Sequence, residues 1–345
     1  MPSAPIELRE AAPDPLVAIA ERLCGDKVIS VQPCGGGGNN RVYRILTRGG
    51  VFAGKFYGSG ELDDRDRLGH EFDGLRFLKR CGIGSSVPAA LAVDRTARCA
   101  LYEWIEGVTP ADHGAADVAA VLDLLAAVHR ARKAEGAFGL PAATESVLRL
   151  SDLVDQIEGR HARLATVTPS EPDLAVFLET ELRPEVDRRL ARLVDWDLDT
   201  ALPPTRRTLS PSDFGFHNSL RRPDGSLGFL DFEYFGWDDP VKLTADFLWH
   251  PAMQLSAAER LQFLDGVTQL YAEDGDFLPR LAVCFPLYGI RWALIILNEF
   301  LPQLWARRAF SGKGGDWDAA KRDQLCKARA KLAALRSYRE GSFAT

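Results

Sequence analysis

The stretch TLSPSDFGFHNSLRRPDGSLGFLDFEYFGWDDP, residues 208–240, decides what kind of fold this chain adopts. It opens with a loop that carries an aspartate, Asp213, and an asparagine five residues later, Asn218. A turn at residues 222–225 follows, and a short apolar run then leads to a second aspartate, Asp231. Carboxylates and an amide in this order supply oxygen ligands for Mg²⁺ beside a group that orients a reacting hydroxyl. The stretch therefore predicts a site where magnesium and a hydroxyl group meet.

A simpler interpretation is that these polar residues only form turns through hydrogen bonds to the backbone. That interpretation accounts for Asp224, but it accounts poorly for Asp231, which lies in the apolar sequence GFLDFEYF at residues 228–235. A charge buried there needs a metal ion or a cationic partner. In a strand, Asp231 and Glu233 point to one face, so Glu233 is a candidate second metal ligand or a contact for the acceptor.

The chain has 345 residues, a length at which one core usually divides into two. Hydrophobic periodicity predicts two helices and five strands near the N-terminus, at residues 15–23 and 65–80, and at 28–32, 41–47, 51–57, 89–94 and 99–103. Later segments are predicted to be helices, at residues 114–135, 144–164, 174–193, 257–272, 279–301 and 318–339.

This order predicts an α+β fold with two lobes. Residues 1–105 are expected to form a small antiparallel sheet with one key helix, and residues 106–345 a large, mostly helical lobe with a cleft between the two. A helical insertion at residues 144–194 is expected to form part of the wall around the reacting hydroxyl.

A glycine-rich run lies between the first two predicted strands and consists of Gly35, Gly36, Gly37, Gly38, Asn39 and Asn40. Without side chains, its backbone amides can approach phosphate groups closely. The run has neither the GxGxxG nor the GxxxxGK[ST] spacing, so it predicts neither a Rossmann turn nor a Walker loop. The alternative is a loose hairpin with no ligand.

Lys55 lies in the apolar strand VFAGKFY, where an unpaired ammonium group is costly to bury. It therefore needs an acidic or phosphate partner. Glu71, sixteen residues later in the predicted helix 65–80, is a candidate, with Glu61, Asp63, Asp64 and Asp66 as alternatives. The preceding glycine run favours a role in phosphate binding over an exposed edge lysine.

Composition excludes several classes of protein. The net charge of -6 indicates no general basic surface for nucleic acid, and the six cysteines form no CxxC pair, which argues against structural zinc. A disulfide framework is not expected in a chain of this length, so a reducing, cytoplasmic setting is expected. The N-terminus has no apolar segment typical of a signal peptide. Residues 285–301 are apolar but contain Pro286, Arg291, Asn298 and Glu299, so they predict a buried helix and no membrane partner.

Taken together, these residues resemble the aminoglycoside phosphotransferase family, which shares the protein-kinase-like fold with choline kinases and several sugar kinases. The resemblance covers roughly residues 29–247, and its specific part is the block from Asp213 to Asn218 followed by DFE at residues 231–233. It implies an enzyme that moves the γ-phosphoryl group of ATP or GTP to a small-molecule hydroxyl. By resemblance, Asp213 orients and deprotonates the acceptor, while Asn218 and Asp231 hold Mg²⁺.

The resemblance also implies how the nucleotide is bound. Lys55, oriented by Glu71, would bind the α and β phosphates, and the glycine-rich run would cover them. The backbone at Glu103 and Ile105, in the hinge-like LYEWIEG, would meet the base. Asp246 would brace the catalytic loop from a helix.

One position departs from the family pattern. The family usually has a histidine and a glycine before the catalytic aspartate, and this chain has Pro211 and Ser212. The loss of the histidine leaves open a second hypothesis, a weak or inactive kinase-like protein that binds nucleotide. A third hypothesis is nucleotidyl transfer by the same fold.

No activation segment for docking a polypeptide follows Asp231, so the acceptor is expected to be a small molecule. A sugar, an amino sugar or an amino alcohol fits, because aromatic and acidic side chains suit both cation–π contacts and sugar stacking. Candidate acceptor contacts are His217, Glu233, Tyr234, Trp237 and Asp238. The alternative is that most of these aromatic residues belong to the core.

Overall fold

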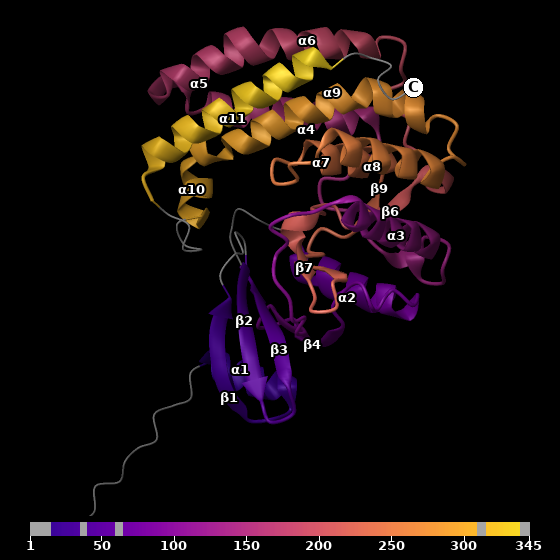
Figure 1. Cartoon of the computed structure of the whole chain (residues 1–345). Coiled ribbons are helices and arrows are strands. Elements are labelled where there is room, and N and C mark those ends of the chain that lie inside the picture. Colours follow the sequence, from indigo (N-terminus) through magenta and orange to yellow (C-terminus); the bar gives the residue numbers. More distant parts are fainter. Residues whose placement is uncertain (1–14, 35–39, 59–64, 309–314, 339–345) are drawn as a thin grey trace, which may run out of the picture.

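The protein forms an antiparallel sheet near its N-terminus and a larger, mostly helical part, as the computed structural model in Figure 1 shows. The structure describes residues 15–34, 40–58, 65–308 and 315–338. This architecture confirms the predicted α+β class. The predicted glycine-rich residues Gly35, Gly36, Gly37, Gly38 and Asn39 lie outside the described residues.

The sheet has five strands in the order β1-β2-β3-β5-β4. Their bounds are Val28–Cys34, Asn40–Thr47, Val51–Tyr57, Ala90–Asp94 and Cys99–Glu103, for β1 to β5 in turn. The β2–β3 hairpin closes where Thr47 N–H donates to the Gly50 carbonyl over 2.9 Å. In this register Val42 lies opposite Lys55, so the hairpin carries the lysine on the strand next to the glycine-rich run.

Two helices cover opposite faces of the sheet because neighbouring side chains on a strand alternate. On β5, Leu101 packs with Ala20 of α1 (Pro15–Cys24) in a small separate core. Its neighbour Tyr102 faces α2 (Arg67–Arg80) in the main core, which continues into the helical part. Helix α2 is therefore the packed link between the two parts of the molecule.

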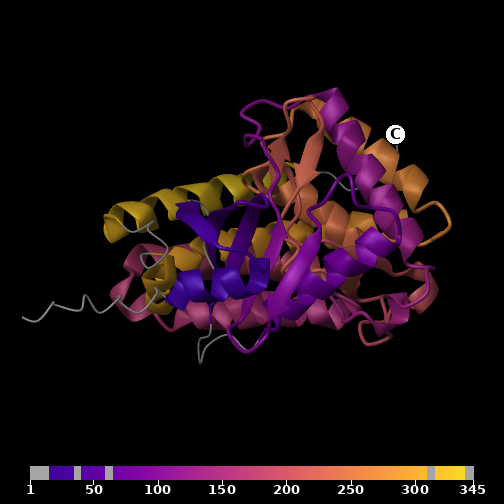
Figure 2. The same ribbon diagram turned by 90° about the horizontal axis from the view of Figure 1, so that it is seen from below.

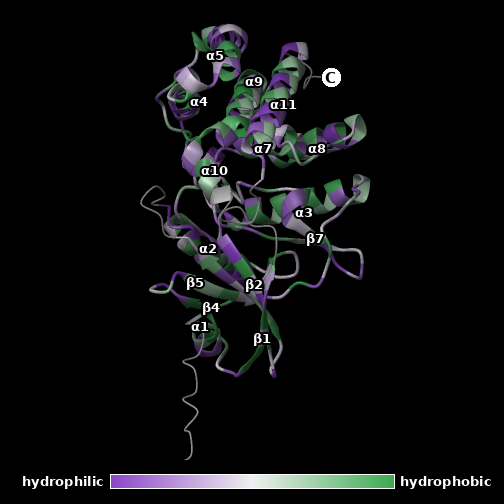
Figure 3. Cartoon of the chain, turned by 90° about the vertical axis from the view of Figure 1, so that its left-hand side faces the viewer, coloured by the Kyte–Doolittle hydropathy of each residue, from purple (hydrophilic) through white to green (hydrophobic). Residues whose placement is uncertain are grey.

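The helical part is arranged in layers (Figure 1, Figure 2). Its α-helices are α3 Ala115–Ala131, α4 Leu150–Ala165, α5 Pro172–Val176, α6 Arg183–Leu190, α7 Pro240–Trp249, α8 Ala257–Leu270, α9 Phe277–Ile296, α10 Pro302–Arg308 and α11 Trp317–Ser337. Helices α4, α5, α6, α9 and α11 lie farthest from the sheet, and many of the helices carry both apolar and polar residues (Figure 3).

The structure corrects two predicted helices. The helix predicted at 144–164 starts at residue 150, and the one predicted at 174–193 contains a π-helical segment, Phe177–Leu182.

Helix α9 packs against α4, α7 and α11. Together with the 3₁₀ turn Leu297–Phe300 it is long and apolar enough to span a membrane by composition, but 72% of its apolar window is buried inside the protein. The buried core helix of a protein can have the same length and apolar composition. The prediction of a buried helix fits this placement, although α9 ends at residue 296 and Pro302, which suits the first turn of a helix, starts α10.

The stretch 208–240 folds as two short antiparallel pairs. Strand β6 (Thr208–Ser210) pairs with β9 (Gly236–Asp238), and β7 (Ser219–Arg221) pairs with β8 (Leu227–Phe229). The first aspartate follows β6 and the second follows β8. The Leu230 N–H donates to the Asn218 carbonyl over 2.8 Å, so the loop after β6 is fastened to the residue before Asp231.

Substitutions at two helical glycines are expected to change stability in opposite directions. A Cβ added at Gly159 of α4 meets open space, whereas one added at Gly74 of α2 falls 2.5 Å from the buried Phe235 ring. We expect Gly159→Ala to raise the free energy of unfolding by about 0.5–1 kcal/mol through helix propensity. Gly74→Ala should lower it by roughly 1 kcal/mol, because overpacking outweighs that gain. Urea denaturation measures both, and stabilisation by Gly74→Ala would contradict the packing of α2 described here.

Candidate active site

Lys55 of β3 lies at the centre of a buried cluster of carboxylates. Its Nζ is 2.6 Å from Glu71 Oε2 on α2, 2.5 Å from Asp231 Oδ1 and 3.8 Å from Glu233 Oε2. The side chains of Lys55, Glu71 and Glu233 are each less than a tenth exposed, and that of Asp231 is 37% exposed. The structure thus joins Lys55 to the predicted Glu71 and brings both to Asp231.

The charges in this cluster depend on one another. Burial favours the neutral amine, but Asp231, Glu71 and Glu233 outweigh it and raise the pKa of Lys55 above its ordinary value. Burial also raises the pKa of Glu71 to about 7, against the lowering effect of Lys55. The lysine therefore stays charged, and three carboxylates face it.

Tyrosine hydroxyls complete the support of Glu71. Tyr57 OH donates to Glu71 Oε2 over 2.7 Å, and Tyr57 OH and Tyr102 OH lie 2.6 Å apart. Because both rings are buried, Glu71 keeps one orientation toward Lys55. The strand sequence alone gave no indication of this role for the tyrosines.

Asp231 does not lie in a strand, as had been expected, but in the left-handed region with a φ of 66°. This conformation costs a residue with a side chain roughly 1–2 kcal/mol. It turns the chain after β8, so that Asp231 and Glu233 both reach Lys55. Such strain outside glycine is typical of functional positions.

Glu233 faces the sheet. Its Oε2 accepts a hydrogen bond from Asn40 Nδ2 at the start of β2, and its Oε1 is 3.9 Å from Arg67 Nε. Glu233 was considered as a second metal ligand or as an acceptor contact, and its placement beside Lys55 and Asp231 favours the first of these roles. Asn40, which belongs to the glycine-rich run, lies at the same place.

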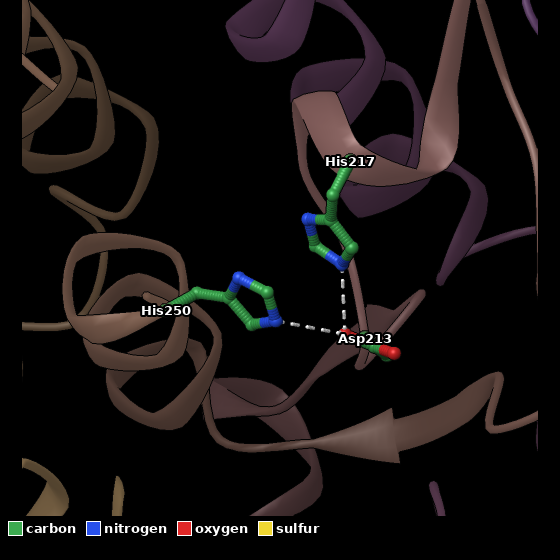
Figure 4. Close-up of side chains that lie close together, drawn as sticks. All are labelled: Asp213, His217 and His250. Atoms are coloured by element: carbon green, nitrogen blue, oxygen red, sulfur yellow. Dashed lines mark hydrogen bonds and ion pairs between the residues drawn. The ribbon is translucent and has the colours of Figure 1, made fainter. Parts of the chain in front are cut away.

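Asp213 is held between two histidines (Figure 4). His217 Nε2 lies 3.1 Å, and His250 Nε2 3.7 Å, from the same oxygen, Oδ1. Burial alone raises the pKa of the Asp213 carboxyl, but the hydrogen bond from His217 and the nearby His250 and Lys242 lower it below its ordinary value. The carboxylate is therefore charged at neutral pH while its side chain remains 38% exposed.

Asn218 connects the two aspartates. Its Nδ2 donates to the Asp213 backbone carbonyl over 3.0 Å, which leaves Oδ1 as the oxygen available for a cation. Its own carbonyl accepts from the residue before Asp231. Asp231 and Asn218 thus supply the hard oxygen donors that Mg²⁺ prefers, on a loop fixed by hydrogen bonds.

Two of the predicted acceptor contacts are wrong, because they lie inside the protein. Trp237 is 9% exposed and donates from Nε1 to the Ala137 carbonyl over 2.9 Å. Asp238 is fully buried, accepts from Val147 N–H over 2.9 Å and pairs with Lys242 Nζ at 3.1 Å. Both residues serve to hold the stretch 208–240 to its surroundings.

Tyr234 is partly buried under two arginines, with the guanidinium carbons of Arg65 and Arg67 at 5.6 and 5.7 Å from its ring centroid. Glu103, at the end of β5, accepts from Ala89 N–H through its side chain over 3.1 Å, and Ile105 is buried. Their predicted contacts with acceptor and nucleotide base stay predictions.

Sequence reasoning missed His250. It lies 37 residues beyond Asp213 at the end of α7, and no spacing connects the two. Asp246, expected to brace the loop, pairs with Arg291 at 3.0 Å and accepts from Trp292 Nε1 over 2.8 Å. It also pairs at 3.0 Å with Lys242, whose Nζ donates to Ser212 Oγ, beside Asp213, over 3.4 Å. It thereby joins α7, which carries His250, to α9.

Within the described residues, two groups of side chains lie close enough to share a metal ion: Glu71, Asp231 and Glu233 in one, and Asp213, His217 and His250 in the other. The first group is made of oxygen donors and includes a predicted magnesium ligand. The second contains two nitrogen donors, which are not ligands that Mg²⁺ favours.

Residues 30–282 of the chain match the Phosphotransferase enzyme family. Similar solved structures include a spectinomycin phosphotransferase in complex with ADP and spectinomycin, 13% identical over 94% of this chain and 98% of that chain, with a TM-score of 0.63. The choline kinase from Streptococcus pneumoniae is 18% identical over 89% and 94% of the two chains, with a TM-score of 0.53. A fructosamine-3-kinase, described as putative, from Thermobifida fusca is 19% identical over 92% and 99%, with a TM-score of 0.53. These likenesses confirm the predicted fold, and no protein with a curated description matches the chain.

The lysine cluster predicts a large effect of removing its cation. Lys55→Met leaves buried carboxylates without a partner, so we expect the free energy of unfolding to fall by roughly 3 kcal/mol. The double variant Lys55→Met with Glu71→Gln removes one of those charges and should recover part of the loss. Lys27→Met, which breaks only the exposed pair with Glu21, serves as the control and should change stability by less than about 1 kcal/mol. Equal stability of Lys55→Met and the wild type in urea would contradict the charge state assigned to the cluster.

Proposed function

Because the chain belongs to the phosphotransferase enzyme family, we propose that it moves the γ-phosphoryl group of ATP or GTP to a hydroxyl of a sugar, an amino sugar or an amino alcohol. The observation that carries this proposal is the pair of hydrogen bonds through Asn218. One runs to the Asp213 backbone and the other to the residue before Asp231. They connect the loop of the charged, accessible Asp213 to the residues proposed to bind the cation, which supports an arrangement suited to phosphoryl transfer.

Asp213 is the group proposed to receive the acceptor's proton. As the acceptor oxygen forms its bond to the γ phosphorus, the bond from that phosphorus to the bridging oxygen breaks and the nucleoside diphosphate leaves. The hydroxyl proton passes to a free oxygen of the Asp213 carboxylate. Its lowered pKa keeps this carboxylate ready to accept a hydrogen bond from the hydroxyl and to orient it.

The nucleotide side of the site is proposed to use the lysine cluster. Asp231 and Asn218 would hold Mg²⁺, which when bound neutralises charge on the phosphates. Lys55 would bind the α and β phosphates, with its position set by Glu71. The three carboxylates gathered at Lys55, one of them the proposed metal ligand Asp231, support a site that takes a cation and a nucleotide together.

The acceptor is proposed to lie against the wall formed by residues 144–194, in the lobe 106–345. Glu145 at the start of that segment pairs with Arg291 at 2.9 Å, and Arg291 pairs with Asp246 on the helix that leads to His250. These ion pairs join the start of the segment to α9 and α7, which supports its proposed role as part of the wall. Tyr234 remains a proposed acceptor contact, whereas Nε2 of His217, predicted as another, is bonded to Asp213. Glu103 and Ile105 remain the proposed contacts of the nucleotide base in the lobe 1–105.

Matched variants test the separate roles proposed for Asp213, as proton acceptor, and Asp231, as metal ligand. Asp213→Asn should lower kcat by about 10²–10⁴-fold while Mg-nucleotide binding is retained, because only the proton acceptor is lost. Asp231→Asn should weaken nucleotide binding in the presence of Mg²⁺, since it removes a charged metal ligand. Asp224→Asn, on an exposed turn of the same stretch, should behave as wild type. Steady-state kinetics and calorimetry give both quantities, and full turnover by Asp213→Asn would refute the role of that residue.

The product distinguishes the three hypotheses. With sugars, amino alcohols and aminoglycosides as acceptors, mass spectrometry should find a product that is heavier by one phosphoryl group. Addition of a whole nucleotide would show nucleotidyl transfer instead. Binding of Mg-ATP without any product would support the hypothesis of an inactive kinase-like protein, which the absence of a histidine at residues 211–212 raised.

A further inference from the structure

We propose that His217 and His250 are positioning residues for the Asp213 carboxylate: His217 donates a hydrogen bond from Nε2 to Oδ1, and His250, stacked on His217, turns its own Nε2 toward the same oxygen at 3.7 Å. Their role in catalysis rests on the proposed function. Figure 4 shows both rings approaching the same carboxylate oxygen, while the other oxygen points away from them. That second oxygen is the one left for the acceptor hydroxyl.

The two rings form one unit. They stack in parallel, with centroids 3.9 Å apart and planes inclined by 6°. Their Nε2 atoms lie 3.1 Å and 3.7 Å from Asp213 Oδ1. A carboxylate held from two sides in this way cannot rotate about its last bond without losing both contacts.

The hydrogen bonds of His250 determine which nitrogen carries its proton. The Ala252 N–H donates to His250 Nδ1 over 3.2 Å, so Nδ1 carries a lone pair and the proton of the neutral ring is on Nε2. Burial and the neighbouring His217 lower the pKa of His250 to about 4, so the ring is neutral at pH 7. His250 therefore presents an N–H to the aspartate.

The position of His250 is fixed by the protein around it. Its backbone N–H donates to the Asp246 carbonyl over 2.9 Å at the end of α7. Its ring meets Trp292 edge to face, with centroids 4.7 Å apart and planes at 82°. Since Trp292 is itself hydrogen-bonded to the Asp246 side chain, His250 is held by two helices, α7 and α9.

His217 depends on Gly215 for its place. A Cβ at Gly215 would lie 3.1 Å from His217 Nδ1 and 2.4 Å from Met253 Sδ, and the φ of Gly215 is 158°. Only glycine leaves room for the ring to turn back onto Asp213. Nδ1 of His217 is buried without a hydrogen-bond partner, so Nε2 is the nitrogen that bonds to Asp213.

The same three side chains are close enough to hold a metal ion, but their hydrogen bonds argue against that use. A metal-binding histidine offers an unprotonated nitrogen and donates from the other one. In His250 the nitrogen that faces Asp213 is the protonated one. The arrangement therefore fits hydrogen bonding to a carboxylate and does not fit metal ligation.

Nitrogen-detected NMR of the imidazoles tests the arrangement without any acceptor. We expect the Nε2–H form for both histidines, a change of both Nε2 resonances in Asp213→Ala, and no change on addition of Zn²⁺. An Nδ1–H form of His250, or a shift of its Nε2 resonance by Zn²⁺, would overturn the proposal. If the wild type proves to transfer no phosphate, the proposed function fails while this measurement still decides the positioning role.

Kinetics of two variants test the consequence for turnover. His250→Phe keeps a ring against Trp292 and His217 but has no N–H dipole directed at the carboxylate, and we expect kcat to fall about 10-fold, which corresponds to about 1.4 kcal/mol. His250→Gln restores a donor and should recover much of that loss. The KM for nucleotide and the unfolding midpoint should change little in His250→Phe, and Asp224→Asn, on the exposed turn at residues 222–225, is the control. Unchanged kcat in His250→Phe, or equal losses in both His250 variants, would refute the role.

Discussion

The ion pairs of Lys55 are the constraint on which the rest of the structure depends. A single ammonium group joins the sheet through β3, helix α2 through Glu71, and the stretch 208–240 through Asp231. Removing charged groups from water is costly unless their geometry is good and further hydrogen bonds satisfy them. Here those bonds come from Tyr57 and Asn40, so the two parts of the molecule meet at a defined distance and angle. Such a pairing stabilises one arrangement more than it stabilises the fold as a whole.

Much of this organisation was predictable from local patterns. Strand β3 and its lysine, helix α2 and its glutamate, and the turn at residues 222–225 follow from apolar periodicity and from the positions of glycine and proline, which act over a few residues. Short segments were less predictable. Strands β6 to β9 have three residues each, too few to show a period, and the π-helical segment 177–182 depends on tertiary packing.

Some residues of the candidate site could likewise be predicted from the sequence, and others could not. Asp213 and Asp231 could be predicted because a charged group in an apolar stretch requires a metal ion or a cationic partner. Trp237 and Asp238 have the same residue types as a sugar-binding surface, and only the tertiary structure shows that they are buried. His250 had no signal at all, since its contact with Asp213 is made between a loop and the end of a helix that adjoin only after folding. The chemistry of a residue can be read from sequence, whereas its neighbours cannot.

In the folded protein, other side chains can orient Asp213 in place of the histidine that usually precedes this aspartate in the family. Ser212, in its place next to the aspartate, adopts a left-handed φ of 67°, and no imidazole precedes it at Pro211. An aspartate in a loop still has to be oriented, because a freely rotating carboxylate would lose much of the advantage of its position. Two imidazoles now face it, one from four residues along the loop and one from the end of α7. The requirement is geometric, so a donor from elsewhere in the sequence can satisfy it, and the loss of one conserved-looking motif residue is weak evidence for an inactive enzyme.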